Sequence, residues 1–191
     1  LGGALFLPCG IRGRAIDRMS SQTGLTLDGM AFMRTSTVRD GSPGNDQEIP
    51  LEGDYYAIRW MQDHIQGSPV ILEGLSWSEY RWGNRVSIHT GLPAVIGWSW
   101  HQRQQRAAVA ALAAQVELRR NDVNECYDTT DIHRALEILD RYGVRYIYVG
   151  DYERAYYSPT GLVKFDMMAA EGLLQVVYDD RGVRIYEVIG R

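Results

Sequence analysis

The residues best suited to chemistry lie in one stretch of the chain, between Glu73 and Arg106. This stretch holds four of the five tryptophans, two of the four histidines and several arginines. Indole rings can cover the apolar face of a sugar while polar side chains fix its hydroxyls. We therefore predict a binding site for a sugar or another polar ligand. Its candidate residues are Glu73, Trp77, Glu79, Tyr80, Arg85, His89, Trp98, His101, Gln105 and Arg106.

Other interpretations of the same residues stay open. The tryptophans could belong to the core and the arginines could form structural ion pairs. Glu73 and Glu79 could act as the paired carboxylates of a glycoside hydrolase. His89 and His101 could bind a metal with Glu73, but no ligand spacing supports this, so we predict no metal site.

Familiar cofactor and catalytic motifs are absent from the sequence. No strand is followed by a glycine-rich dinucleotide motif, and there is no P-loop, zinc-protease helix or nucleophile elbow. We therefore predict no cofactor. The net charge of -4 argues against a nucleic-acid partner, because a phosphate backbone needs a basic face.

Hydrophobic periodicity predicts the elements that position these residues. We expect buried strands at 70–73, 85–89, 94–97 and 144–149, and helices at 54–65, 102–120, 131–142 and 164–170. Asp131 and Gly143 are typical of a helix start and a helix end. Alternation around Asp179–Gly182 predicts a C-terminal hairpin. The predicted fold is α/β and three-layer Rossmann-like, with a mostly parallel sheet, helices on both faces and an antiparallel C-terminal hairpin.

In such a sheet, ligands bind outside the carboxyl ends of the strands. Glu73, His89 and the Gly97–Trp98 pair end three of the expected strands, so we expect one crevice there. Residues 101 and 105 share one face of the following helix, as do 102 and 106. The start of that helix, with an added arginine, could hold an anion.

We divide the chain at residue 53. Residues 1–53 show little periodicity, and we interpret them as an extended strap leading into an α/β domain at 54–191. The apolar segment Leu1–Pro8 is short, ends at proline and has no basic residue before it. We expect that it could be the outer end of a membrane helix in a longer protein.

Several segments resemble a known family. The segments concerned are Asp54–Trp60, Arg85–Trp98, His101–Arg106, Tyr142–Arg154 and Gly161–Phe165. Together they resemble the C-terminal part of the YYY family of bacterial and archaeal membrane proteins.

This resemblance implies a polytopic membrane protein with a soluble C-terminal domain on the extracytoplasmic side of the cell membrane. The family's membrane part is similar to GT-C glycosyltransferases, which use sugars linked to lipid phosphate. The expected partners are the protein's own transmembrane region and a lipid-linked sugar or glycan acceptor. The catalytic acidic residue of such enzymes lies in a loop near the N-terminus that is absent here, so we expect this fragment alone to be inactive.

A looser likeness concerns Val70–Tyr80. This segment is similar to the strand and W-W-D-Y-G motif of oligosaccharyltransferase catalytic subunits. Trp77 and Tyr80 match that motif, whereas Ser78, Glu79 and Arg81 depart from it. The resemblance implies that Trp77, Glu79 and Tyr80 face an acceptor, and that Arg85, His101 and Arg106 face phosphate or sugar hydroxyls. The alternatives are a non-catalytic carbohydrate-binding or scaffold module, and a free-standing glycoside hydrolase that uses Glu73 and Glu79.

Overall fold

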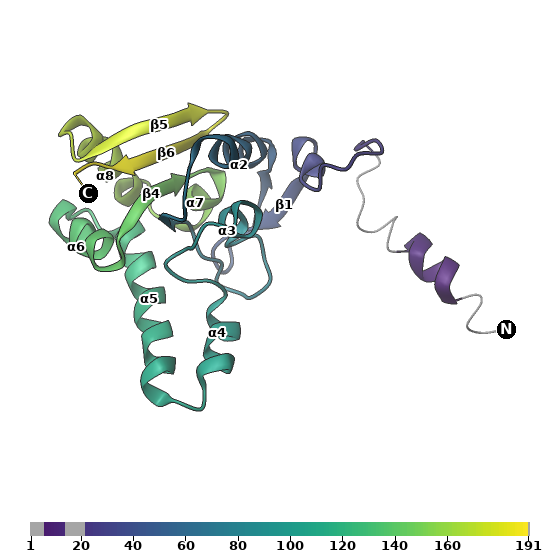
Figure 1. Ribbon diagram of the computed structural model, residues 1–191, viewed down its shortest axis with the longest axis horizontal. Helices are drawn as coiled ribbons and strands as arrows, with labels where there is room; N and C mark the ends of the chain where they lie inside the picture. The colour runs from purple at the N-terminus through teal and green to yellow at the C-terminus, as the bar shows by residue number, and fades with distance from the viewer. Residues whose placement is uncertain (1–5, 14–21, 191) are drawn as a thin grey trace.

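A computed structural model describes residues 6–13 and 22–190, and within them two sheets and their covering helices form the fold (Figure 1). The strands are β1 (Thr37–Asp40), β2 (Gln47–Pro50), β3 (Val70–Leu72), β4 (Val144–Val149), β5 (Leu174–Asp180) and β6 (Val183–Val188). The helices are η1 (Ala31–Arg34), α2 (Glu52–His64), α3 (Arg85–Thr90), α4 (Ser99–Arg106), α5 (Ala110–Asp128), α6 (Ile132–Tyr142), α7 (Asp151–Tyr156) and α8 (Pro159–Ala170).

The larger sheet is mixed, with strand order β3-β4-β6-β5. Only β3 and β4 run parallel, whereas β6 pairs antiparallel with both β4 and β5. The smaller sheet is the antiparallel pair β1-β2. The prediction of a mostly parallel, Rossmann-like sheet is therefore wrong, although the α/β class and the antiparallel C-terminal hairpin are confirmed. The parallel part is small because two of the segments expected to be strands form other structures.

The first of these segments, 85–89, forms helix α3 instead of a strand. Val86 is fully buried but Ile88 is 56% exposed, so the two side chains do not share one face. The side chain of Glu73 accepts hydrogen bonds from the backbone N–H groups of Val86 and Ser87. A carboxylate distant in sequence thus satisfies N–H groups at the start of the helix, which local pattern alone could not show.

The second segment, 94–97, reaches the sheet at only one position. Ala94 forms an isolated parallel bridge with Ile71 of β3. The backbone of Ile71 donates to Pro93 and accepts from Val95, at 2.8 and 3.2 Å. The segment therefore lies beside the edge of β3 without extending the sheet.

Helices pack on both faces of the larger sheet. On one face, Ile58 of α2 and Val86 of α3 join Tyr148 and Ile185 in a buried cluster. On the other face, α5, α6 and α8 pack against the alternate strand residues, which include Ile147 and Tyr186. This alternation follows from the two-residue period of a strand.

The helix expected at 102–120 is divided into α4 and α5, which form a helical hairpin that projects from the sheet (Figure 1). The division falls at residues 107–109. No residue of α4 is buried, and burial along α5 begins only at Val116. The hairpin is therefore held to the domain by its base, where Val123, Cys126 and Tyr127 enter the core.

Other local predictions are confirmed. The side chain of Asp131 accepts from the backbone N–H groups of His133 and Arg134 at the start of α6. Gly143 ends that helix with a left-handed φ of 61°. The hairpin between β5 and β6 turns at Arg181 and Gly182, both with positive φ, as a tight two-residue turn requires.

The segment before residue 54 is partly ordered. Met33, Ile49 and Leu51 are buried and pack against the domain. Residues 6–13 are helical, and the first five residues of Leu1–Pro8 lie outside the described residues. Among the residues that are described, no helix is long and apolar enough to cross a membrane. The division of the chain at residue 53 stays a prediction.

Candidate functional site

Arg85, a predicted binding residue, lies inside the domain between two carboxylates. Its guanidinium donates to both oxygens of Asp54, at 2.5 and 3.0 Å, and to both oxygens of Glu153, at 3.0 Å each. The rings of Tyr148 and Tyr152 lie 5.0 and 4.7 Å from it. Because all four partners come from other elements, Arg85 joins α2, α3, β4 and α7.

Burial by itself would lower the pKa of Arg85, but Asp54 and Glu153 outweigh that effect and raise this pKa well above its ordinary value. Glu153 also accepts from the backbone N–H groups of Gly74 and Gly150. Asp54 accepts from Trp82 and Tyr148 as well. The charges are therefore paired and hydrogen-bonded, as buried charges must be.

Glu73 is also buried, beneath the start of α3. Its two oxygens accept from Val86 and Ser87 at 2.8 and 2.9 Å. Burial raises the pKa of Glu73 to about 7, against the opposing effects of Arg85 and of these N–H donors. The carboxyl group supports the backbone of α3 and faces the protein interior.

The loop 76–84 brings aromatic side chains to the surface. Arg81 lies over the ring of Trp77, with 5.0 Å between the guanidinium carbon and the ring centroid. The same arginine donates to Asp40 at 2.9 Å, and Asp40 also accepts from Tyr156 at 2.6 Å. Asp40 is buried. The end of β1 thus holds the loop against α7.

Glu79 fixes the other side of this loop to the start of α4. Its Oε1 accepts from the Ser99 hydroxyl at 3.1 Å and from the Trp100 backbone N–H at 2.7 Å. Its Oε2 is buried without a hydrogen-bond partner, and so is the indole Nε1 of Trp98. Both residues line one small cavity of about 10 Å³. An unpaired acceptor and an unpaired donor therefore belong to residues that line the same cavity, and such groups call for an explanation.

Tyr80 stands between Glu79 and α4 in a strained conformation. Its φ is 60°, a left-handed value that is uncommon for any residue other than glycine. Its side chain is 63% exposed, and its ring packs on Trp98 at 4.9 Å between centroids. Its hydroxyl lies 3.3 Å from His101 Nδ1, and His101 Nε2 lies 3.0 Å from the amide nitrogen of Gln105. Tyr80, His101 and Gln105 thus form a surface chain of polar groups around exposed aromatic rings.

Arg106 faces a groove between α4, α5 and the segment 94–95. The groove has a volume of about 300 Å³. Its charged lining residues are Arg106 and Arg119, with Gln102 and Gln115 beside them and no carboxylate among the lining side chains. Arg119 also donates to the backbone carbonyl of Val95 at 2.9 Å. The groove therefore offers positive charge and amide groups, which suit an anion.

His89 lies apart from this surface. It is half-buried near the ring of Trp82, and burial lowers its pKa. Within the described residues, no group of three or more histidine, cysteine or acidic side chains is placed to hold a metal ion.

The fold brings the predicted residues together in two groups. Tyr80, Trp98, His101 and Gln105 are joined by direct contacts at the surface, and Glu79 contacts Ser99 and Trp100 beside them. Trp77 belongs to the same loop and Arg106 to the same helix. Glu73 and Arg85 lie in the core. Glu73 accepts hydrogen bonds from the backbone of α3, and Arg85 donates to the carboxylates of Asp54 and Glu153. The predicted crevice at three strand ends does not form, because 85–89 is a helix and 94–97 contributes one bridge. Binding roles for all ten residues stay predictions.

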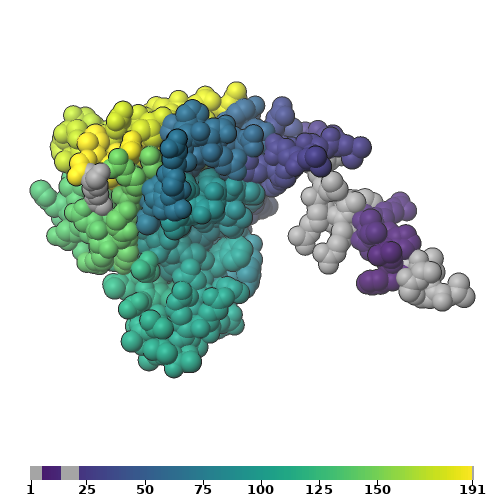
Figure 2. Space-filling view, in the orientation of Figure 1, coloured from purple at the N-terminus to yellow at the C-terminus, as the bar shows by residue number. Residues whose placement is uncertain are grey.

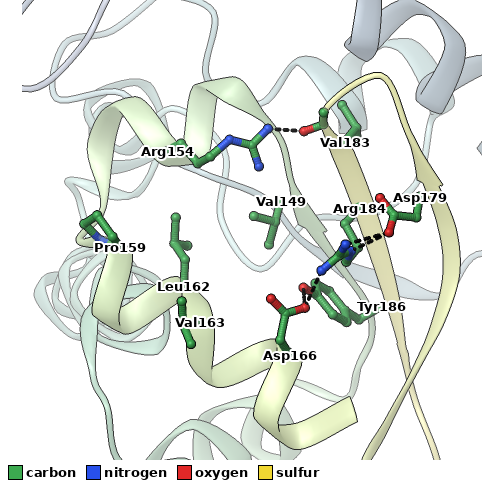
Figure 3. A pocket seen from close by; sticks show the side chains of 11 residues that line it. Val149, Arg154, Pro159, Leu162, Val163, Asp166, Asp179, Val183, Arg184 and Tyr186 are labelled. Carbon is green, nitrogen blue, oxygen red and sulfur yellow. Dashed lines mark hydrogen bonds and ion pairs between the residues drawn. The ribbon is translucent and has the colours of Figure 1, made fainter. Parts of the chain in front are cut away.

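Sequence reasoning did not find a second groove, of about 410 Å³, between α7, α8 and the β5–β6 hairpin (Figure 3). Val149, Leu162 and Val183 contribute apolar side chains to it. At its rim, Arg184 pairs with Asp166 and Asp179, and Arg154 donates to the carbonyl of Gly182. Its charged groups are largely satisfied by one another. No single motif marks this groove, because its residues come from separate elements.

No family model and no curated protein matches the chain. Among solved structures, the chain is similar to the C-terminal globular domain of an oligosaccharyltransferase from Archaeoglobus fulgidus. The TM-score is 0.43 and the sequence identity 16%, over 70% of this chain and 95% of that domain. A likeness at this TM-score does not assign a function, and the resemblance to the YYY family stays a prediction.

Proposed function

We propose that this chain is an extracytoplasmic accessory domain of a glycosyltransferase-like membrane protein. In this proposal it binds the sugar-phosphate part of a lipid-linked sugar, or a glycan acceptor, at the surface formed by the loop 76–84 and α4. The reacting groups would belong to the membrane part of the parent protein. The support comes from the motif resemblance and from the side chains at this surface.

The observation that carries the proposal is the conformation of Tyr80. A non-glycine residue in a left-handed conformation costs free energy and persists only where its surroundings hold it, which occurs often at binding sites. Here the strained residue presents an exposed ring beside His101. Aromatic faces with adjacent polar groups suit sugars.

The groove beside Arg106 supports the phosphate part of the proposal. Two guanidinium groups and two amides line it without a carboxylate. Guanidinium groups match the geometry of phosphate oxygens. A sugar bound at Tyr80 and a phosphate bound near Arg106 would both contact α4, since His101 and Arg106 belong to that helix.

The proposal is tested by titrating the full chain with N-acetylglucosamine 1-phosphate and mannose 1-phosphate, and with the same sugars without phosphate. Tryptophan fluorescence and amide NMR shifts report binding. We expect the phosphorylated sugars to bind more tightly. Arg106→Gln should weaken their binding by about tenfold, because it removes one charge-assisted contact. Tyr80→Ala should weaken binding of both kinds of sugar.

Arg59→Gln provides the control, because Arg59 is an exposed arginine on α2. If no sugar binds, or if the Tyr80 and Arg106 variants bind as the unchanged chain does, the site is wrong. In the full-length parent, Ala substitutions at His101 and Arg106 should reduce function in cells. Arg85 is unsuitable for this test, since its loss would disturb the core.

A second candidate is a non-catalytic carbohydrate-binding or scaffold module. Exposed aromatic rings at Trp77 and Tyr80 fit this function equally well. Equal affinity for neutral and phosphorylated sugars, with no effect of the Arg106 variant on transfer by the parent protein, would favour it.

The hydrolase alternative has less support from the geometry. Glu73 and Glu79 hold the starts of two different helices, α3 and α4, and the cavity beside Glu79 has a volume of only about 10 Å³. A panel of aryl glycosides assayed with the full chain tests it, and hydrolysis that depends on both glutamates would revive it.

A further inference from the structure

The charge of the chain is unevenly distributed along the sequence. The chain as a whole carries a net charge of -4, yet no aspartate or glutamate occurs from Tyr80 to Val116. The charged residues in that stretch are Arg81, Arg85, Arg103 and Arg106. Three of these arginines reach the surface, because only Arg85 is buried. The charged side chains of residues 80–116 are therefore all positive, between Glu79 on one side and the acidic residues of α5, beginning at Glu117, on the other.

The projecting end of this region is also apolar. The exposed side chains of Trp100, Val109, Leu112 and Leu118 have exposed fractions between 41% and 50%. Ala107, Ala108, Ala110, Ala111 and Ala114 are exposed around them. The hairpin end appears as the lower projection of the space-filling view, away from the main body of the domain (Figure 2). We call residues 100–118 the hairpin tip.

Tryptophan and arginine are paired at the tip and at the neighbouring loop. Arg103 lies over the ring of Trp100, and Arg81 lies over the ring of Trp77, each with 5.0 Å from the guanidinium carbon to the ring centroid. Both tryptophans are exposed. The first acidic residue after the tip's apolar turn, Glu117, pairs with Arg103 and Arg120, at 3.0 Å each. These ion pairs offset the charge of Glu117 and part of the arginine charge, and the tip, with Arg103, Arg106 and Glu117, keeps a net charge of +1.

We propose that the hairpin tip docks on the surface of an anionic lipid bilayer. Tryptophan is favoured at the boundary between headgroups and acyl chains, because its ring is apolar and its N–H is polar. Arginine keeps its charge in the headgroup layer while its stem lies along apolar surface. Basic side chains are attracted to anionic lipids, and small apolar side chains can enter the boundary region.

Charge complementarity favours a bilayer over a second copy of this chain. A second copy would also present arginines at its tip, and like charges would repel. The decisive variant leaves the proposed sugar site unchanged, because Val109 and Ala111 lie outside the loop 76–84 and α4. A failure of either proposal can therefore be recognised separately.

The experiment is sedimentation of the full chain with vesicles of phosphatidylcholine and phosphatidylglycerol at a molar ratio of about 7 to 3, and with vesicles of phosphatidylcholine alone. We expect binding to the mixed vesicles, about tenfold weaker binding to the neutral ones, and release by high salt. Brominated lipids should quench tryptophan fluorescence, and Trp100→Phe should reduce that quenching.

The decisive variant is Val109→Asp with Ala111→Glu, which adds two negative charges to the tip. Acidic side chains at the start of a helix are favourable, so the variant should fold, which circular dichroism checks. We expect its partitioning to fall by at least about tenfold, since each charge opposes the anionic surface. The matched control is Val163→Glu with Met167→Glu, two exposed positions on α8. This control should bind as the unchanged chain does.

A third variant separates the tip from the exposed apolar side chains of residues 6–13. Leu7→Ser with Ile11→Ser removes two of them. The proposal is overturned if the tip variant still binds mixed vesicles, or if only the Leu7 and Ile11 variant loses binding. It is also overturned if the tip variant and the α8 control lose binding equally, because net charge alone would then explain the effect.

Discussion

The buried charges are the residues whose roles are most sharply defined. Arg85 lies between Asp54 and Glu153, and neither carboxylate has another cation as a hydrogen-bond partner within the described residues. Removing one member of a buried charge group leaves the others unpaired in a poorly solvated interior. The arginine therefore matters to stability whatever its relation to a ligand.

We predict that Arg85→Met lowers the free energy of unfolding by about 3–5 kcal/mol, the typical cost of breaking a buried ion pair. Arg85→Lys should recover only part of this, because an ammonium group cannot form the same paired contacts. Urea denaturation measures both values. The control, Arg59→Met on the exposed side of α2, should change stability by less than about 0.5 kcal/mol. Equal effects at the two positions would contradict this role.

The raised pKa of Glu73 leads us to predict that the free energy of unfolding depends on pH. Burial raises its pKa to about 7, above the ordinary value of 4.5. The folded protein therefore binds this proton more tightly than the unfolded chain does. The stabilisation is fully present below about pH 4.5 and is lost as pH rises through 7, with a total of about 3 kcal/mol.

The measurement is the free energy of unfolding of wild type and Glu73→Gln between pH 4.5 and 8. Burial lowers the pKa of His89, so this residue makes stability rise with pH, and it does so in both proteins. The difference between the two curves therefore isolates Glu73. Wild type should lose stability relative to the variant as pH rises, and parallel curves would show that the pKa of Glu73 is not raised.

Among the elements, α5 and α8 approach each other closely at Gly161. A Cβ on Gly161 would lie 2.3 Å from the carbonyl oxygen of Tyr127 and 2.7 Å from that of Asp128. Lys164, one turn later, donates to the same Tyr127 carbonyl at 3.0 Å. The backbone at the end of α5 is thus in close contact with Gly161 at the start of α8 and is hydrogen-bonded to Lys164 of the same helix.

We predict that Gly161→Ala lowers the free energy of unfolding by about 2 kcal/mol or more, because α8 must shift away from α5. The control is Gly29→Ala, where a Cβ would meet no atom within 4 Å. That control should stay within about 0.5 kcal/mol of wild type. Thermal unfolding followed by circular dichroism compares the two, and a neutral Gly161→Ala would show that this contact adapts.

For the whole molecule, stability should be distributed unevenly. The larger sheet is covered on both faces, whereas α4 has no buried residue and α5 is buried only from Val116 onward. Helices without buried apolar contacts open at low free energy. The projecting hairpin should therefore open without unfolding the sheet.

We predict that backbone amides of α4 and of residues 110–115 exchange with solvent much faster than those of β4 and of residues 123–128. Hydrogen exchange followed by mass spectrometry measures this difference. Mixed vesicles should slow exchange in the hairpin while leaving β4 unchanged. Uniform exchange across α5 would contradict the predicted gradient.

Local patterns in the sequence were enough to predict several elements. Asp131 and Gly143 marked the ends of α6, and alternation around the turn at Asp179–Gly182 marked the C-terminal hairpin. These signals succeed because a cap, a glycine with positive φ or a two-residue period acts within a few neighbouring residues. The sequence by itself also indicated where aromatic and basic residues gather, between Glu73 and Arg106.

Only the tertiary structure decided which of those residues share a surface. The segment Arg85–His89 has the alternating pattern of a strand. It forms a helix in the structure, where the side chain of Glu73 accepts hydrogen bonds from the N–H groups of Val86 and Ser87. Arg85 could have faced a ligand, but Asp54 and Glu153, 31 and 68 residues away, draw its guanidinium into the core. The proportion of parallel and antiparallel strands also depended on tertiary pairing, because β4 pairs parallel with β3 and antiparallel with β6. Burial and pairing between distant residues set these outcomes, and a single sequence does not display them.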